Sequence, residues 1–322
     1  MISLKKILLA LACMALPLAG WSQAYPSKPI KIMVTIGPGS SADILARIVA
    51  EELQRRLGQP VVVENKPGAG GNIAADAVAK SAPDGYTLLM STISTHAINA
   101  AMYPSMPFDP IKDFAHIALL AANPNALVVL PNAPVQSLKD LLELAAKKPG
   151  EVSYSSGGSG TSQHLAGELM GSLAKLKLTH VPYKSTPESM NAVLSGQVTL
   201  SFVSVPVALA QVKAGKLKAL GVTSDKPLPW WSEMPALASQ GLPGFNVSAW
   251  FGMSAPAGTP EVIVNRLNAD LMAVMALPSV REKLQAQGME VLGGSPAQYL
   301  EYIRAETERW GRIVRASGAK VN

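Results

Sequence analysis

The chain alternates short β-branched runs with longer segments of helical periodicity, and this order constrains its fold more than any other feature. Near the start, strands are expected at 31–35, 61–64 and 86–90, with helices at 44–57 and 72–80 between them. A β-α-β-α-β order predicts parallel strands in one sheet that helices cover on both faces. The chain therefore belongs to the α/β class.

The same alternation restarts further along the chain and ends in a helical tail. Strands are expected at 126–130, 152–154, 178–181, 198–203 and 219–223. Beyond Pro256 the pattern becomes mostly helical. Two such units predict two domains.

Two crossovers between these domains are expected. The first lies at Asn123-Pro124-Asn125, and the second falls near 245–249, after a loop-like segment that is rich in proline and glycine. Domain 1 would then comprise 25–124 and 248–322, and domain 2 would comprise 125–247. Since open α/β sheets bind ligands at the carboxyl ends of their strands, a ligand cleft is expected between the two domains.

A loop with the composition of an anion site follows the first expected strand and leads into a helix. Glycines there let the backbone approach a ligand, and the free N–H groups and positive dipole end of a helix start favour an anion. The alternative is an ordinary turn in which a serine caps the helix. The candidate ligand-binding residues of this loop, which spans 37–43, are Pro38, Gly39, Ser40, Ser41 and Asp43.

A second loop of this kind, 155–164, also follows a strand and opens a helix. Its run of serine, glycine and threonine offers many hydrogen-bond donors and almost no charge, as expected of a pocket for a carboxylate. The alternative is a flexible surface loop. Its candidate ligand-binding residues are Ser156, Gly158, Ser159, Gly160, Thr161 and Ser162.

A third glycine-rich loop, 65–71, contains a partial Gly-x-Gly, but Ile73 stands where a dinucleotide fingerprint requires a third glycine. A structural turn is favoured there, with a contribution to the cleft wall as the alternative. No cofactor is expected. No metal is expected either, because metal-ligand spacing is absent among the histidines His96, His116, His164 and His180.

The sequence has no Gly-x-Ser-x-Gly elbow, no Walker A motif and no His-Glu-x-x-His, so the protein is expected not to be an enzyme. One alternative is a secreted hydrolase that uses a serine of the 155–162 loop with His164. The formal net charge is +6, but the basic residues are dispersed and aromatic residues make up only 5%. This composition argues against a nucleic-acid partner.

The first residues carry the features of an export signal. A basic start precedes an apolar run at 7–18, which is too short to span a bilayer as a permanent helix, and a small-x-small site follows. Residues 1–24 are expected to be a signal peptide that is cleaved after Ala24. Cleavage before a lipidated Cys13 is the alternative.

Several blocks of the sequence match a known family. The longest is 57–71, which runs from Leu-Gly-Gln-Pro to Gly-Ala-Gly-Gly. The other matching segments are 46–47, 82–89, 158–161, 164–165, 181–184 and 196–198. Together they resemble the periplasmic solute-binding receptors of tripartite tricarboxylate transport systems, also called Bug-type receptors, over essentially the whole chain beyond residue 24.

This resemblance implies a two-domain Venus-flytrap fold, the type II-like periplasmic-binding-protein architecture with two crossover strands. It implies that the loops at 37–43 and 156–162 capture a small organic carboxylate in the cleft, with Tyr183 as a further ligand-binding residue. The implied partners are inner-membrane permease subunits, and the implied location of this monomeric receptor is the periplasm. A sensor that presents its ligand to a membrane signalling protein is the alternative role.

The sequence departs from the family pattern at several positions. Gly37 stands where proline is usual, and Ser40 stands where a second glycine is usual. Ala192 and Thr199 each replace a frequent aspartate. These changes bear on the identity of the ligand, whereas both loops keep their pattern of glycines and hydroxyls.

Overall fold

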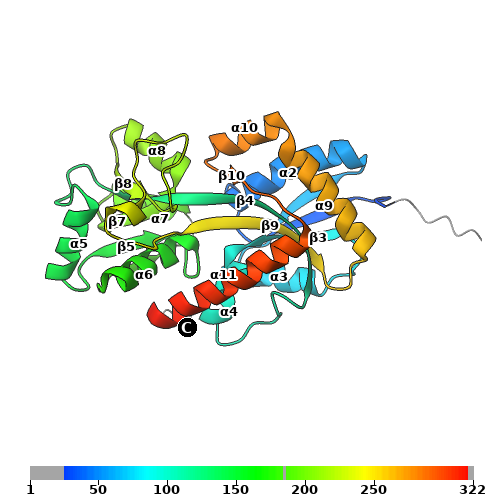
Figure 1. Ribbon diagram of the computed structural model, residues 1–322, viewed down its shortest axis with the longest axis horizontal. Helices are drawn as coiled ribbons and strands as arrows, with labels where there is room; N and C mark the ends of the chain where they lie inside the picture. The colour runs from blue at the N-terminus through cyan, green and yellow to red at the C-terminus, as the bar shows by residue number, and fades with distance from the viewer. Residues whose placement is uncertain (1–24, 184–185, 318–322) are drawn as a thin grey trace, which may run out of the picture.

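The structure, a computed structural model, describes residues 25–183 and 186–317. The expected signal peptide with Cys13 and Ala24, and Lys184 of one matching segment, lie outside these residues. The described chain forms two lobes that share a mixed sheet (Figure 1). Within the described ranges, no helix combines the length and the apolar character needed to cross a membrane.

Lobe 1 is built on three parallel strands. β1 lies between β2 and β3 and pairs with both in parallel register. These strands are β1 (Ile30–Val34), β2 (Val61–Asn65) and β3 (Thr87–Thr92). Their parallel pairing confirms the expectation from the alternating pattern, because a helix carries the chain back before each new strand.

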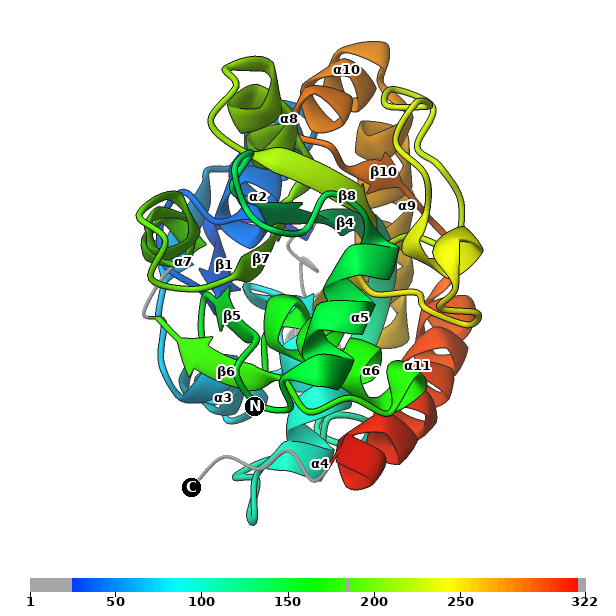
Figure 2. The same cartoon turned by 90° about the vertical axis from the view of Figure 1, so that its left-hand side faces the viewer.

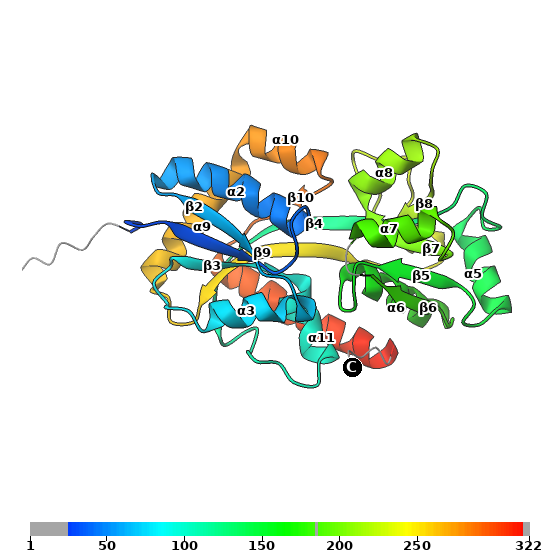
Figure 3. The same ribbon diagram turned by 180° about the vertical axis from the view of Figure 1, so that it is seen from behind.

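Helices cover both faces of this part of the sheet (Figure 3). Ile32 of β1 belongs to an apolar cluster with α2 and α9, whereas its neighbour Met33 belongs to a cluster with α3. Adjacent strand residues thus face opposite layers. The longer helices around these strands are α2 (Ser41–Leu57), α3 (Asn72–Ala79), α9 (Glu261–Ala276) and α10 (Pro278–Ala286).

Lobe 2 repeats the arrangement of helices around parallel strands, and Figure 2 looks directly onto it. β5 pairs in parallel with β6 and with β7. The strands are β5 (Ser153–Ser156), β6 (Thr179–Pro182), β7 (Leu200–Ser204) and β8 (Lys218–Val222). The helices are α5 (Leu138–Lys147), α6 (Ser162–Ala174), α7 (Thr186–Leu194) and α8 (Val205–Lys213), with a short 3-10 helix η3 (Leu237–Gln240).

Two long strands, β4 (Phe114–Val129) and β9 (Ser248–Pro256), run side by side between the lobes (Figure 1). They pair in antiparallel register up to the pair Pro124 and Ser248. From Asn125 onward, β4 pairs instead with β7 and β8 of lobe 2. β9 also pairs antiparallel with β3, so the sheet of lobe 1 is mixed and not purely parallel as expected. The physical reason is that β9 carries the chain back from lobe 2 and so enters the sheet from the opposite end.

The alternating pattern predicts neither the first part of β4 nor β9. Both strands are buried on both faces along most of their length, so they lack the alternation of a half-buried strand. Several short elements also escape the pattern. They are η1 (Ala69–Gly71), the π-helix η2 (Ser94–Ile98), α4 (Asn99–Met102) and β10 (Glu290–Val291), which pairs with β4.

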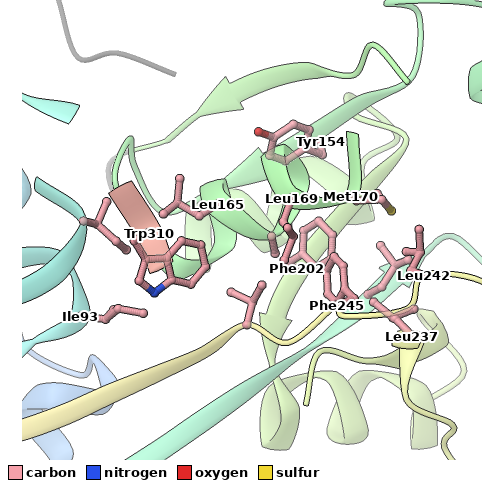
Figure 4. Close-up of a cluster of buried hydrophobic side chains, with 14 of the residues drawn as sticks. Ile93, Tyr154, Leu165, Leu169, Met170, Phe202, Leu237, Leu242, Phe245 and Trp310 are labelled. Atoms are coloured by element: carbon pink, nitrogen blue, oxygen red, sulfur yellow. The ribbon is translucent and has the colours of Figure 1, made fainter. Parts of the chain in front are cut away.

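The last helix, α11 (Pro296–Ser317), spans both lobes on one side of the crossing strands (Figure 1). Its Trp310 is fully buried and lies in the same apolar cluster as Leu165 of α6 and Phe202 of β7 (Figure 4). The indole N–H of Trp310 donates to the Glu306 carboxylate at 2.9 Å, which also accepts from Trp250 at 3.1 Å. α11 therefore ties lobe 2 to the first lobe.

Replacement of this tryptophan tests its contribution to stability. Trp310→Ala is expected to lower the free energy of unfolding by about 3–5 kcal/mol, because it leaves a cavity where an aromatic ring was fully buried. Urea denaturation followed by circular dichroism measures the change. The control is Arg312→Ala on the same helix, whose side chain is 63% exposed, with an expected change within about 0.5 kcal/mol. Equal changes in the two variants would contradict this account of α11.

Candidate functional site

The first glycine-serine loop leaves β1 and ends at the N-terminus of α2. Ser40 caps the helix, because its Oγ accepts from the N–H of Asp43 at 3.3 Å. The N–H of Gly39, a residue with φ of +77°, donates to Asp43 Oδ2 at 2.9 Å. Pro38 and Gly39 are exposed at the tip, whereas Ser40 and Ser41 are half-buried. The loop is therefore held in shape by its own hydrogen bonds, with its tip open to solvent.

The Asp43 carboxylate forms hydrogen bonds within its own loop and helix. Its Oδ1 accepts from Arg47 Nε at 3.0 Å, and only 3% of the residue is exposed. Burial alone would raise the pKa of Asp43, but hydrogen bonds from Arg47, Gly39 and Asn65 and the charge of Arg47 lower it below its ordinary value. The carboxylate is thus ionised at the positive end of α2, where it accepts hydrogen bonds from Gly39 and Arg47 that hold the loop in its conformation.

The second loop leaves β5 and ends at the N-terminus of α6. Thr161 caps this helix by accepting from the N–H of His164 at 3.3 Å, and its hydroxyl donates to the Gly158 carbonyl at 2.7 Å. Gly158 and Gly160 have φ of +131° and +81°, values that favour glycine. The candidate residues Ser156, Gly160 and Ser162 are buried, and Gly158, Ser159 and Thr161 are half-buried.

Two buried histidines contact the second loop. His164 Nδ1 accepts from the N–H of Gly160 at 3.2 Å, and the His164 ring stacks on His180 at 4.0 Å between centroids. His180 Nε2 lies 2.6 Å from Ser156 Oγ. Burial lowers the pKa of His164 to about 4, and burial with the neighbouring His164 lowers the pKa of His180 to about 3. Both rings are therefore neutral near pH 7, the state that lets His164 accept a hydrogen bond.

This histidine pair gives the fold an acid-sensitive component. Since the pKa of His164 in the folded chain is below the value of about 6.5 in an unfolded chain, the unfolded chain takes up the proton first. The contribution of His164 to the free energy of unfolding is expected to be fully present above about pH 6.5 and to decline as the pH falls towards about 4. His164→Asn is expected to flatten this decline, as measured by urea midpoints across that range. Parallel curves for the two proteins would show that His164 does not contribute to it.

The second loop contacts lobe 1 directly. Ser94 Oγ of η2 in lobe 1 donates to the Gly160 carbonyl of lobe 2 at 3.0 Å. A Cβ on Gly160 would lie 3.2 Å from Asn99 Oδ1 of lobe 1. The second loop therefore packs against lobe 1 at the point where η2 passes into α4.

The third glycine-rich loop lies beside the same contact. Asn99 Nδ2 donates to the Gly70 carbonyl at 3.0 Å, so this side chain lies between the third and second loops. A Cβ on Gly71 would lie 2.9 Å from Thr35 Cβ, just past the end of β1. Glycine is required here by close packing, as expected of a structural turn, and the loop lies beside the end of β1.

Among the contacts within the described chain, Tyr183 meets the second loop through its backbone. Its N–H donates to the Ser156 carbonyl at 2.9 Å, whereas its phenol lies 3.4 Å from Gln197 Oε1. The ring packs beside the apolar cluster of α7 and α8. The sequence predicted Tyr183 as a ligand-binding residue, and in the structure its side chain points towards Gln197.

Both helix starts carry N–H groups without a partner in the described chain. The N–H groups of Ser41 and Ala42 in α2, and of Ser162 and Gln163 in α6, have no hydrogen-bond partner among the described residues. The first turn of a helix leaves such groups unpaired within the helix, and its dipole favours an anion. No lysine or arginine lies within either loop. The donors are therefore backbone amides and hydroxyls.

The described part of the chain contains no cluster of three or more His, Cys, Asp or Glu that could hold a metal ion. Two cavities lie away from the loops. One of about 370 Å³ lies between α8 and α10, and one of about 630 Å³ lies beside α4. Neither is lined by a residue of the two loops, so the candidate site rests on the geometry of the helix starts.

The hydrolase alternative finds no support in this geometry. His164 bonds the Gly160 N–H and not a serine hydroxyl. Ser156, which does meet His180, is fully buried, and its Oγ is occupied by donation to the Gly158 carbonyl at 3.0 Å. A nucleophile must reach its substrate, and this hydroxyl is enclosed.

Comparison with known proteins agrees with the architecture. The curated relative "Protein BugT" of Bordetella pertussis is 35% identical over 98% of this chain and 96% of its own length. The solved structure "R. palustris Rpa4515 with adipate" superimposes with a TM-score of 0.86 at 35% identity, covering 92% of this chain and all of the other. "MatC (Rpa3494) from Rhodopseudomonas palustris with bound malate" gives a TM-score of 0.82 at 31% identity, over 90% of this chain and all of the other.

The resemblance noted in the sequence is thus confirmed, as is the two-lobed binding-protein fold. Residues 45–319 match the family described as "Tripartite tricarboxylate transporter family receptor". Since this match covers most of the chain, the protein belongs to the family of tripartite tricarboxylate transporter receptors, the Bug-type solute-binding proteins.

Proposed function

We propose that this receptor captures a small organic carboxylate between its two glycine-serine loops and delivers it to inner-membrane permease subunits. The observation that carries the proposal is the pair of opposed helix starts, α2 in lobe 1 and α6 in lobe 2, whose first-turn N–H groups are unpaired in the described chain. Two such donor groups suit the oxygen atoms of a carboxylate. Adipate and malate, which occupy two related structures, have this chemistry.

The remaining parts of the proposal follow from the family and the sequence. The receptor acts as a monomer in the periplasm, after cleavage of the signal peptide following Ala24. It binds its ligand without chemical turnover. Its two domains comprise 25–124 with 248–322, and 125–247, and the change of β4 partners between Pro124 and Asn125 supports this division.

A ligand screen tests the carboxylate proposal. The protein is unfolded, dialysed and refolded to remove any bound ligand, and is then titrated with mono-, di- and tricarboxylates that include adipate and malate. At least one compound is expected to raise the melting temperature, because a ligand that binds only the folded state stabilises it. Calorimetry then gives the affinity. Lack of response to every carboxylate class would overturn the proposal.

Substitutions at the loop glycines test the location of the site. Gly39→Asp and Gly160→Asp are expected to weaken carboxylate affinity at least about tenfold, because each adds a negative charge beside the anion donors. The matched control is Gly215→Asp in lobe 2. Gly215 has φ of +68°, and a Cβ added there would meet no atom within 4 Å, as is also true of Gly39. Wild-type affinity in both loop variants, or equal loss in the control, would contradict the assignment.

A further inference from the structure

Asn123 and Asn125 lie on one face of β4 where this strand passes between the lobes. Side chains two apart on a strand point the same way. Both residues are buried, with 3% and 4% of their surface exposed. Pro124 between them has a fixed φ and no N–H, so its ψ is its one soft backbone dihedral and any bend of the strand here is limited to few angles.

Asn123 contacts the loop of lobe 1. Its Nδ2 donates to Ser41 Oγ at 2.9 Å, and Ser41 is the first residue of α2. The Oδ1 of Asn123 is buried and has no partner among the described residues. An amide oxygen only accepts, and so does an ionised carboxylate, so this atom is not a contact for the carboxylate itself, and the role of Asn123 toward the loop rests on its bond to Ser41.

Asn125 makes the corresponding contact in lobe 2. Its Nδ2 donates to Ser162 Oγ at 3.3 Å, and Ser162 is the first residue of α6. Its backbone N–H donates to Thr223 Oγ1 at 2.8 Å. The same threonine hydroxyl donates to the carbonyl of Val247 at 2.6 Å, just before β9 begins. Both chain crossings are thus anchored to lobe 2 through Thr223.

We propose that Asn123 and Asn125 are positioning residues that couple the two ligand-binding loops through the crossing strand. One asparagine holds the start of α2 and the other holds the start of α6, so a change of backbone angle between them moves Ser41 relative to Ser162. Cleft width and the placement of the anion donors therefore change together. This inference deepens the proposed function and rests on it for its ligand.

Independent local contacts are the competing explanation. If each asparagine merely supports its own lobe, the effects of removing the two on ligand affinity add. If the two form one connection, loss of either breaks it, and the second substitution adds little. The double variant separates these cases.

The first experiment measures malate and adipate affinity by calorimetry in Asn123→Ala, Asn125→Ala and the double variant. Each single variant is expected to lose about tenfold in affinity, because the serine at the start of one helix loses the donor that positions it, and the double variant is expected to lose no more than about tenfold. The matched control is Asn268→Ala. Asn268 Nδ2 donates to the carbonyls of Ile117 and Gly294 in lobe 1, away from both loops. Its affinity is expected to be that of the wild type.

The second experiment needs no ligand. Spin labels are attached to Val262→Cys in α9 and Lys139→Cys in α5, in a Cys13→Ser background that removes the single native cysteine. Val262 is 74% exposed, and the Lys139 side chain is 83% exposed. The distance distribution between the labels reports the angle between the lobes. It is expected to broaden in both asparagine variants and to stay unchanged in Asn268→Ala.

The outcomes distinguish this inference from the proposed function. Wild-type distance distributions in both asparagine variants, or additive losses of affinity, would overturn the coupling even where carboxylates bind normally. Failure of every carboxylate to bind would overturn the proposed function, and the label distances would still decide whether the asparagines couple the lobes.

Discussion

The arrangement of this receptor depends on the hydrogen bonding of β4. Along its first part the strand is paired with β9, and from Asn125 it is paired with β7 and β8. One continuous backbone therefore belongs to both lobes, and the pairing fixes how the sheet of each lobe is directed. Because of this direction, the loops that follow β1 and β5 lie opposite each other (Figure 3). Strand pairing thus places the two helix starts, and α11 limits their separation through the buried Trp310.

The loops are preorganised by groups that do not themselves need to touch a ligand. Asp43 uses both carboxylate oxygens on Gly39 and Arg47, and His164 accepts from Gly160. These bonds leave N–H groups in the first turns of α2 and α6 without a partner among the described residues. A site of this kind binds an anion with oriented dipoles instead of a formal positive charge, so little rearrangement is needed when the ligand arrives.

In the coupling that we propose, lobe movement and ligand binding involve the same few residues. Asn123 and Asn125 connect the crossing strand to the first residues of α2 and α6, and Ser94 connects lobe 1 directly to the second loop. Contacts that cross between lobes differ between open and closed arrangements, so a ligand that strengthens them shifts the population towards closure. Because Asn123 and Asn125 lie where β4 passes between the lobes, we expect a small change of strand geometry there to reach both loops.

The sequence by itself determined the α/β alternation, the parallel pairing of β1 to β3, and the position of each glycine-serine loop between a strand and a helix. It also identified the family. These features depend on local periodicity and on turn and cap chemistry, which neighbouring residues specify. Only the tertiary structure decided that β9 enters lobe 1 antiparallel, that Asp43 is bonded within its own loop, and that the Tyr183 ring turns to Gln197. Only the tertiary structure also showed that His180 contacts Ser156 and that Asn123 and Asn125 contact the first residues of α2 and α6. Most of these features depend on a partner far along the chain, and no local pattern encodes the distance between two residues that only folding brings together.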